Sequence, residues 1–224
     1  MSLHHLPVQQ SAYFAVQEPD FPQETAPDLL LALHGYGQMA EKFLATFGRL
    51  RNRNLLIIAP QAPHQFYVKL QPKIVGCTWL TQFERDRSIE EFLGHMTTLF
   101  EHVQNQLRFA PRRVVVLGFS QGVSMAYRLL CSQRLPLAGL IACGGDLPPD
   151  VLDNLSAVNH TPILLAHGND DSIVPRREAD NAEKILQAKG FVVDKYVFPG
   201  GHAIPYFVSD KIIEWMKGQA GSNK

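Results

Sequence analysis

The chain has 224 residues, of which 46% are hydrophobic and 19% charged, a composition typical of a globular protein with a large core. Lysine plus arginine (21) equals aspartate plus glutamate (21), which argues against a basic surface for nucleic acid or anionic lipid. No apolar run approaches the length of a membrane span, and the first residues do not resemble a signal peptide. We therefore expect a cytoplasmic protein with no nucleic-acid partner and no stable membrane insertion.

The first quarter of the chain predicts strands separated by a helix. Residues 10–16 alternate weakly between polar and apolar side chains, which favours an antiparallel edge strand. Apolar runs at residues 29–33 and 54–59 predict buried strands, because strands covered on both faces lose that alternation. Between them, apolar residues recur at helical spacing over residues 40–50, so a helix is expected to connect the two strands.

The next segment, residues 60–87, shows no clean period and predicts a long loop, a feature that is usually functional in a compact domain. Ser88 and Glu91 have the spacing of a capping box, so we expect a helix that opens at Ser88 and continues to Leu107. Later segments repeat the pattern, with strands predicted at residues 137–143, 162–166 and 192–198 and helices at residues 178–189 and 206–217.

The middle of the chain holds its most informative motif. Residues 114–117 are apolar and β-branched and predict a buried strand, and residues 123–130 carry apolar side chains on one face of a helix. Between them lies a G-x-S-x-G sequence centred on Ser120, flanked by Gly118 and Gly122. A strand, a tight turn and a helix are the context in which this motif forms a nucleophile elbow. We interpret Ser120 as a nucleophile; the alternative is a glycine-flanked serine in an ordinary turn.

Strands that alternate with helices predict right-handed crossovers, a mainly parallel central sheet and helices on both of its faces, which is an α/β fold. In such sheets, functional sites form at the edge where the carboxyl ends of the strands meet. Polar segments directly follow four predicted strands, namely His34–Gly37, Ser120, His167–Asp171 and Gly201–His202. The fold is therefore expected to bring these segments to one edge.

A serine hydroxyl needs a base to become a nucleophile, and the base needs an acid that holds its tautomer. In the chain order serine, acid, histidine, the base comes late in the sequence. His202 follows a predicted strand and two glycines, and it is the one histidine that lies after His167. We interpret His202 as the base; the alternative is a histidine in a surface loop.

The acid is expected after the penultimate predicted strand, where Asp170 and Asp171 are both candidates. Either residue alone is also typical of a solvated turn. Asp146 and Asp150, which follow the preceding strand, are less favoured. The residues by themselves leave Asp170 and Asp171 as open alternatives.

The negative oxygen of a tetrahedral intermediate needs N–H donors that are already in place. The backbone N–H of Gln121, first in its helix, is one expected donor. The other is expected in the loop after strand 29–33, where Gly35 and Gly37 permit an unusual backbone path around Tyr36.

Two further histidines, His34 and His167, are expected to be structural hydrogen-bonding residues rather than ligands or bases. No Cys/His spacing suggests a metal site, and no glycine-rich dinucleotide fingerprint follows a strand. The sequence therefore predicts neither a metal nor a cofactor.

Together these segments resemble the α/β-hydrolase superfamily, and within it the phospholipase/carboxylesterase family that includes the acyl-protein thioesterases. The matching pieces extend from about residue 29 to the last helix, and their order and spacing are more specific than any single motif. They are Leu33–Gly37, Gly118–Gly122, His167–Pro175 and Gly201–His202.

The resemblance implies roles for individual residues. The family's H-G-x-x-D-x-x-V-P pattern falls on His167–Pro175 and selects Asp171 as the acid. The family's elbow gives Ser120 as the nucleophile, and its oxyanion hole corresponds to the backbone N–H groups of Tyr36 and Gln121. The sequence departs from the family at Gln38, where members often carry aspartate.

The acyl-binding loop of the family departs as well, since its usual aromatic and acidic stretch is Cys77-Thr-Trp-Leu80 in this chain. By this resemblance, Trp79 and Leu80 are expected to line the substrate pocket. The alternative for Trp79 is a plain core position.

From these observations we expect an α/β-hydrolase fold in a single domain over residues 1–224, with frayed ends at residues 1–9 and 218–224. The expected activity is that of a serine carboxylesterase on a small-molecule ester, possible variants being a lysophospholipid or an acyl thioester. The catalytic residues would be Ser120, Asp171 and His202, in a monomer or homodimer. The alternatives are a serine peptidase or amidase on the same fold, and a non-catalytic binding protein.

Overall fold

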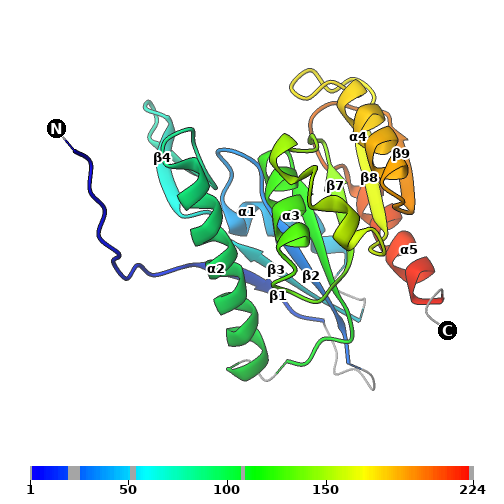
Figure 1. The fold of residues 1–224 in the computed structure, drawn as a ribbon, viewed down its shortest axis with the longest axis horizontal. Coiled ribbons are helices and arrows are strands. Elements are labelled where there is room, and N and C mark those ends of the chain that lie inside the picture. Colours follow the sequence, from blue (N-terminus) through cyan, green and yellow to red (C-terminus); the bar gives the residue numbers. More distant parts are fainter. Residues whose placement is uncertain (1, 20–25, 51–53, 107–108, 222–224) are drawn as a thin grey trace.

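The computed structural model describes residues 2–19, 26–50, 54–106 and 109–221. Within these ranges, one twisted sheet of seven strands has the order β1-β3-β2-β6-β7-β8-β9 (Figure 1). Its neighbouring strands are parallel except for β1, which pairs antiparallel with β3 at one edge. The strands are β1 (Phe14–Gln17), β2 (Asp28–Leu33), β3 (Leu55–Pro60), β6 (Val114–Phe119), β7 (Leu137–Cys143), β8 (Ile163–Gly168) and β9 (Val193–Phe198).

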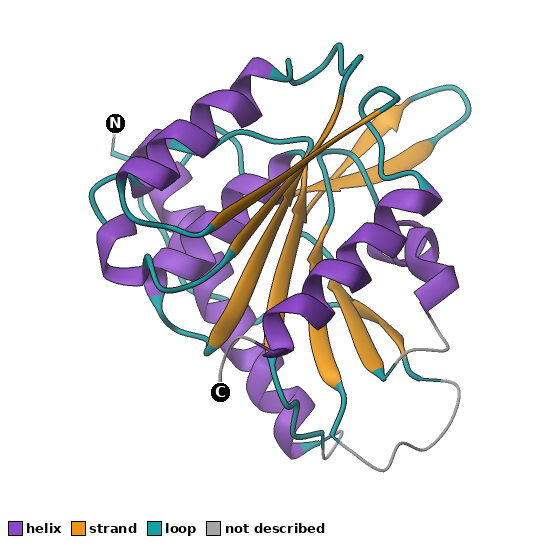
Figure 2. Cartoon of the chain, turned by 90° about the vertical axis from the view of Figure 1, so that its right-hand side faces the viewer, coloured by secondary structure: helices purple, strands orange, loops and turns teal. Residues whose placement is uncertain are grey.

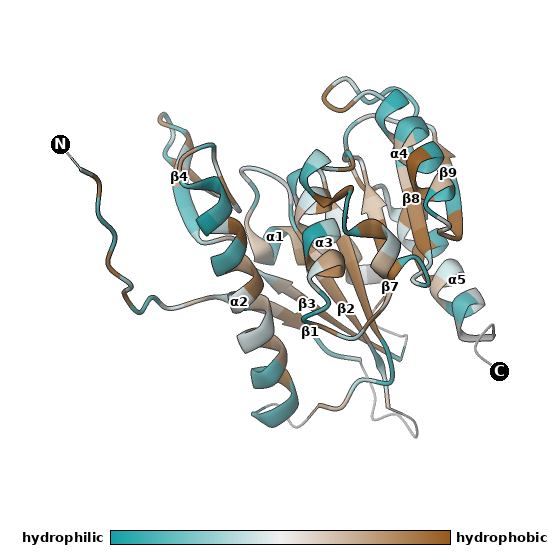
Figure 3. Cartoon of the chain, viewed as in Figure 1, coloured by the Kyte–Doolittle hydropathy of each residue, from teal (hydrophilic) through white to brown (hydrophobic). Residues whose placement is uncertain are grey.

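Helices cover both faces of this sheet, as the edge-on view in Figure 2 shows. They are α1 (Ala40–Leu44), α2 (Arg85–Asn105), α3 (Gln121–Ser132), α4 (Arg177–Ala188) and α5 (Tyr206–Gly221), with 3-10 turns η1 (Ala45–Leu50), η2 (Pro149–Val151) and η3 (Leu155–Val158). Alternate strand residues build the two layers of core: Leu29, Leu31 and Leu33 pack with α2, α3 and α4, whereas Leu30 and Ala32 pack with α1, η1 and α5. Apolar residues accordingly run along the central strands in Figure 3.

The predicted α/β fold and its antiparallel edge strand are therefore confirmed. The predicted helix over residues 40–50 is present as α1 followed by η1. The described part of the chain contains no helix that is both long enough and apolar enough to cross a bilayer.

The predicted start of helix α2 is wrong. The helix begins at Arg85, and Ser88 lies inside its first turn. The backbone N–H of Ser88 donates to Glu84 O at 2.9 Å. Glu84 has a left-handed backbone with φ 47°, so the chain turns sharply into the helix before the serine is reached. The helix ends at Asn105, and the predicted end at Leu107 lies outside the described residues.

The predicted loop over residues 60–87 is also wrong in part, because it contains an antiparallel hairpin of β4 (His64–Lys69) and β5 (Ile74–Thr78). The hairpin forms its own two-stranded sheet, and β4 is almost entirely exposed. A strand with no buried face is under no pressure to alternate polar and apolar side chains, so its sequence carries no period.

The two ends of the chain differ from each other. Residues 2–9 are exposed and lie outside any helix or strand, as expected for a frayed end, and residue 1 lies outside the described residues. At the other end, the prediction is wrong for residues 218–221, because α5 continues through Gly221. The remaining residues 222–224 lie outside the described part.

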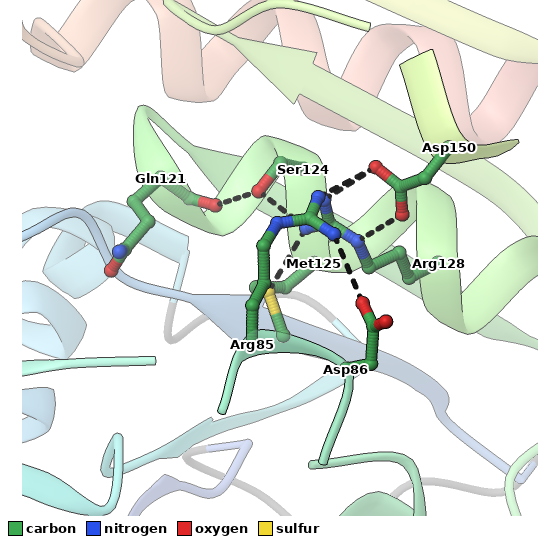
Figure 4. A network of polar contacts seen from close by, with 7 residues as sticks. All are labelled: Arg85, Asp86, Gln121, Ser124, Met125, Arg128 and Asp150. Carbon is green, nitrogen blue, oxygen red and sulfur yellow. Dashed lines mark hydrogen bonds and ion pairs between the residues drawn. The ribbon is translucent and has the colours of Figure 1, made fainter. Parts of the chain in front are cut away.

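A buried arginine ties α3 to the segment after β7 (Figure 4). Arg128 has a side chain that is only 5% exposed, and its guanidinium makes two 2.8 Å hydrogen bonds to the carboxylate of Asp150. The same guanidinium donates to Ser124 Oγ, and Arg85 at the start of α2 also donates to Asp150. One carboxylate thus joins three segments of the chain.

We expect Asp150→Asn to lower the free energy of unfolding by about 2 kcal/mol at pH 7, because it leaves the Arg128 charge without its partner. This is less than for a fully buried pair, since the Asp150 side chain is one-third exposed (34%). Chemical denaturation measures the difference. Asp153→Asn, at an exposed residue three positions along the chain, is the control and should leave stability unchanged.

The same comparison has a predicted pH dependence. The hydrogen bonds from Arg128 hold the pKa of Asp150 well below its usual value. A carboxylate with a depressed folded-state pKa contributes stability above its unfolded pKa of about 4 and loses it as the pH falls further. The gap between wild type and Asp150→Asn should therefore persist from pH 7 to about pH 5 and narrow below about pH 4. A gap that widens in acid would contradict this role of Asp150.

Candidate active site

The turn between β6 and α3 has the backbone of a strained elbow. Ser120 lies at its tip with φ 53° and ψ −119°, a region that residues with a side chain rarely adopt. A Cβ atom at Gly118 would lie 2.4 Å from Gly122 O, and one at Gly122 would lie 2.1 Å from Leu33 O. Both glycines are therefore required by the close approach of the elbow to itself and to the end of β2.

Asp171 and His202 are brought together from two different loops. His202 Nδ1 lies 2.7 Å from Asp171 Oδ2, and the Asp171 side chain is fully buried. The other carboxylate oxygen accepts the backbone N–H groups of Ile173 and Val174 at 2.9 Å. Burial alone would raise the pKa of Asp171, but the hydrogen bonds from His202, Val174 and Ile173 outweigh it and hold that pKa below its usual value. The carboxylate therefore stays ionised beside the imidazole.

Backbone contacts fix these two loops against each other. Asn169 N–H donates to Phe198 O at 2.8 Å, and Asp170 N–H donates to Gly200 O at 2.9 Å. A Cβ atom at Gly168 would lie 2.4 Å from Gly201 O, so the loop that carries His202 rests directly on the end of β8. The Asp170 side chain is exposed, whereas Asp171 turns inward to His202, which separates the two aspartates that the residues alone left open.

The His202 ring lies over the residue that precedes the serine. Its centroid is 4.9 Å from that of the Phe119 ring, and a Cβ atom at Gly144 would lie 3.5 Å from His202 Nδ1. Among the described residues, however, no hydrogen bond joins the Ser120 hydroxyl to the His202 imidazole, whose polar partner is Asp171. Catalytic hydrogen bonds are often long before substrate binds, so this geometry does not exclude His202 as the expected base.

The loop after β2 runs beside the elbow. A Cβ atom at Gly35 would lie 3.1 Å from Ser120 Cβ, so the backbone here is in contact with the serine. In the part of the chain that the structure describes, the backbone N–H groups of Tyr36 and Gln121 donate to no protein acceptor. These are the two donors expected for an oxyanion hole.

His34 fixes the peptide unit that carries one of these donors. Its Nε2 lies 3.1 Å from the backbone N–H of Ala62 and must accept from it, so the proton sits on Nδ1, which donates to Gly35 O at 2.8 Å. Burial lowers the pKa of His34 and favours this neutral form. The Gly35 carbonyl belongs to the same peptide unit as the Tyr36 N–H, so His34 sets the direction of that N–H.

Gln38 holds the other side of Gly35. Its side-chain Oε1 accepts the Gly35 N–H at 2.7 Å, and its own backbone N–H donates to Gly35 O at 3.2 Å. The sequence marks Gln38 as a departure from the family but does not predict this contact.

The expectation that His34 and His167 are structural hydrogen-bonding residues is confirmed. His34 Nδ1 donates to Gly35 O, and His167 Nε2 donates to Val174 O, each at 2.8 Å.

The predicted pocket residues lie differently from each other. Trp79 is fully buried in the core, so its side chain presents no surface to a substrate, in agreement with the core alternative. Leu80 is partly buried against the same core. Two cavities, of about 570 and 780 Å³, lie along the N-terminal segment and α2. Their linings include none of Ser120, Asp171 or His202.

The less favoured acids are engaged elsewhere or exposed. Asp150 pairs with Arg128, and the Asp146 side chain is exposed. Within the described ranges, no three His, Cys, Asp or Glu side chains gather in a way that would hold a metal ion.

Comparison with known proteins places these features in a family. The sequence profile of the Phospholipase/Carboxylesterase family matches residues 11–218. The chain is 27% identical over 177 residues to acyl-protein thioesterase 1 of Yarrowia lipolytica, covering 72% of this chain and 76% of the relative. It is 26% identical over 153 residues to acyl-protein thioesterase 1 homolog 1 of Dictyostelium discoideum, covering 63% of this chain and 67% of the relative.

A solved structure, that of esterase PE8, superimposes with a TM-score of 0.75 at 24% sequence identity. The match covers 93% of this chain and 99% of that chain, so the α/β-hydrolase fold is shared over nearly the whole length.

The crowding at the elbow predicts opposite effects of alanine at two helical glycines. Gly122→Ala should destabilise the protein by about 3 kcal/mol or more, because the new methyl group meets the rigid backbone of β2. Gly94→Ala, in α2 with no atom within 4 Å of the added Cβ, should stabilise it by about 0.5–1 kcal/mol. Melting temperatures of the two variants measure this; equal shifts would show that the elbow tolerates a side chain.

Proposed function

This chain belongs to the phospholipase/carboxylesterase family, and we propose that it is a serine hydrolase that cleaves carboxylic esters through an acyl-Ser120 intermediate. The observation that carries the proposal is the strained backbone of Ser120 at the end of a central strand, with the His202–Asp171 pair lying over the neighbouring Phe119. Ordinary turns do not retain such strain, because it costs on the order of 1–3 kcal/mol.

The base in this proposal is His202. Its Nδ1 is bonded to Asp171, which leaves Nε2 as the atom that takes the proton from the Ser120 hydroxyl. The serine oxygen then bonds to the ester carbonyl carbon, and His202 passes the proton to the departing alcohol. In the second half, His202 removes a proton from water as the water oxygen attacks the acyl carbon, and it returns that proton to the Ser120 oxygen as the acid leaves.

For the first step, His202 Nε2 must lie within hydrogen-bond reach of the Ser120 hydroxyl. Gly200, with φ 137°, and Gly201 directly precede His202, and glycine backbones allow the small rotations that this approach needs. We infer that substrate binding brings Nε2 within hydrogen-bond reach of the serine oxygen.

The carbonyl oxygen becomes negative in the tetrahedral intermediate, and we assign the backbone N–H groups of Tyr36 and Gln121 to it. Two features support this assignment. Neither N–H donates to an acceptor among the described residues, and Gln121 begins α3, where the helix dipole favours negative charge. The proximity of Gly35 to Ser120 also supports a position of the Tyr36 peptide near the reacting atoms.

The acyl group is proposed to lie along the exposed hairpin beside this loop. The ring of Tyr36 packs on Phe66 of β4 with centroids 4.8 Å apart, and a pocket of about 220 Å³ lies between the loop and β5. Of the residues that line this pocket, Ile74 and Val75 are exposed apolar side chains, and the hairpin also exposes Tyr67, Val68 and Leu70. An apolar surface of this kind favours an ester or thioester with an aliphatic acyl chain over a polar peptide.

Thioester cleavage is the second candidate, since relatives of the chain carry the name acyl-protein thioesterase. The same three residues and the same donors would perform it, with a thiol in place of the alcohol as the leaving group. Turnover of matched ester and thioester substrates with one acyl chain, from acetyl to palmitoyl, distinguishes the two.

The decisive test is hydrolysis of short p-nitrophenyl esters by the wild type and by Ser120→Ala. Loss of the nucleophile should lower kcat by roughly 10⁴-fold or more, and Asp171→Asn should lower it by about 10³–10⁴-fold. Asp170→Asn is the matched control at the exposed neighbour and should leave kcat within about twofold. An unchanged rate in Ser120→Ala would exclude the acyl-serine mechanism.

A fluorophosphonate probe addresses the non-catalytic alternative. The wild type should be labelled covalently at Ser120, because only an activated serine reacts at a useful rate. Intact-mass measurement before and after treatment reads the adduct, and Ser120→Ala gives the background. A folded wild-type protein that fails to react would instead indicate a binding protein.

A further inference from the structure

We propose that Trp79 is a positioning residue that ties the two halves of the oxyanion hole together. The inference rests on the function proposed above and assigns a role to a side chain that never touches the substrate. It replaces the expectation that this tryptophan lines the acyl pocket.

Trp79 makes one hydrogen bond to each half. Its indole N–H donates to His34 O at 2.7 Å, and its backbone N–H donates to Gln121 Oε1 at 3.0 Å. His34 begins the loop that carries the Tyr36 N–H, and Gln121 supplies the second N–H. One residue of a separate segment therefore bridges two donors that lie 85 positions apart in the chain, as 121 − 36 = 85.

The contact with His34 acts on the Tyr36 donor through consecutive peptide units. The indole holds the carbonyl between His34 and Gly35, and the His34 ring holds the next carbonyl, between Gly35 and Tyr36. Because each peptide unit is planar, fixing two successive carbonyls fixes the direction of the N–H groups that follow them. Release of the first carbonyl would loosen the path of the loop.

In the contact with Gln121, both the oxygen and the nitrogen of the side-chain amide make hydrogen bonds. The Gln121 Nε2 donates to Thr78 Oγ1 at 2.9 Å and to Leu80 O at 3.0 Å, while its Oε1 accepts the Trp79 N–H. The side chain therefore grips residues 78–80 at three points. Since Gln121 also carries the second proposed oxyanion donor, movement of Trp79 would shift Gln121 at the start of α3.

The indole bond to His34 lies in dry surroundings. The Trp79 side chain is fully buried, its ring is 4.9 Å from that of His34 and 5.4 Å from that of Phe92, and no surface is open to water. A buried carbonyl that loses its donor has no water to replace it, so it moves or stays unpaired at a cost. Removal of the indole N–H should consequently shift the loop instead of being repaired in place.

Trp79→Phe tests this most directly, because it removes the N–H and keeps an aromatic ring. The chain has two tryptophans, and Trp215→Phe is the matched control: its indole N–H donates to Asp194 at 2.8 Å, between α5 and β9. Each variant loses one indole hydrogen bond, which is buried at Trp79 and part-buried at Trp215, so the stability of each variant is measured beside its kinetics. Only the first lies on the path to the oxyanion donors.

We expect kcat for a p-nitrophenyl ester to fall about 10- to 100-fold in Trp79→Phe, with KM within about threefold of wild type. Trp215→Phe should keep both values. Affinity for a trifluoromethyl ketone should fall in parallel with kcat, because Ser120 adds to its carbonyl carbon and leaves an oxyanion that needs both donors, while His202 takes the proton. A merely structural role would lower the stability of Trp79→Phe without lowering kcat selectively over KM.

Equal kinetics in the two variants, or a change confined to KM, would overturn the proposal. If Trp79→Phe does not fold, Gln121→Met decides, since it keeps the backbone donor and removes the side-chain contact with Trp79; an unchanged kcat there would also refute the tie. Failure of the proposed function itself is recognised separately, by a Ser120→Ala variant that retains wild-type activity.

Discussion

The site depends on one close backbone contact, between the first turn of α3 and the end of β2. Gly122 approaches the Leu33 carbonyl so closely that no side chain fits between them. This contact places the elbow at Ser120 and the loop of the proposed oxyanion hole next to each other at the carboxyl edge of the sheet. The strain at Ser120 follows from it, because the chain has one residue in which to turn from β6 into α3.

Much of this could be read from the sequence, because buried parallel strands and strand–helix turns leave strong signals. The apolar runs of β2, β3, β6, β7 and β8 and the glycines around Ser120 report constraints that act on many residues at once. The choice of Asp171 over Asp170 required the family pattern, since two adjacent aspartates in a turn have the same local chemistry. Only the direction of each side chain separates them.

What the sequence could not provide are features that rest on single contacts across long separations. Strand β4 of the hairpin has no buried face that would impose an alternation of polar and apolar residues. Ser88 fits the sequence pattern of a helix cap, but the turn at Glu84 starts the helix. Trp79 looked equally suited to a pocket and to the core. Its two hydrogen bonds, to His34 and Gln121, depend on where three distant segments meet. Local sequence propensity does not predict that meeting point.

The substitution at Gln38 shows how the same loop can be held without a charge. The Gly35 N–H needs an acceptor so that its peptide does not rotate, and the Gln38 side-chain oxygen provides one at 2.7 Å. A carboxylate would do the same, but its negative charge would lie in the loop that we propose stabilises a developing oxyanion, and like charges repel more strongly away from water. An amide supplies the hydrogen bond and omits the repulsion. The neutral His34 on the other side of Gly35 follows the same logic, since burial keeps its ring uncharged and its single proton directed at the Gly35 carbonyl. The loop proposed to hold the oxyanion is therefore held on both sides by neutral groups, and the ionised carboxylate of Asp171 is paired with the imidazole that carries the positive charge in the proposed mechanism.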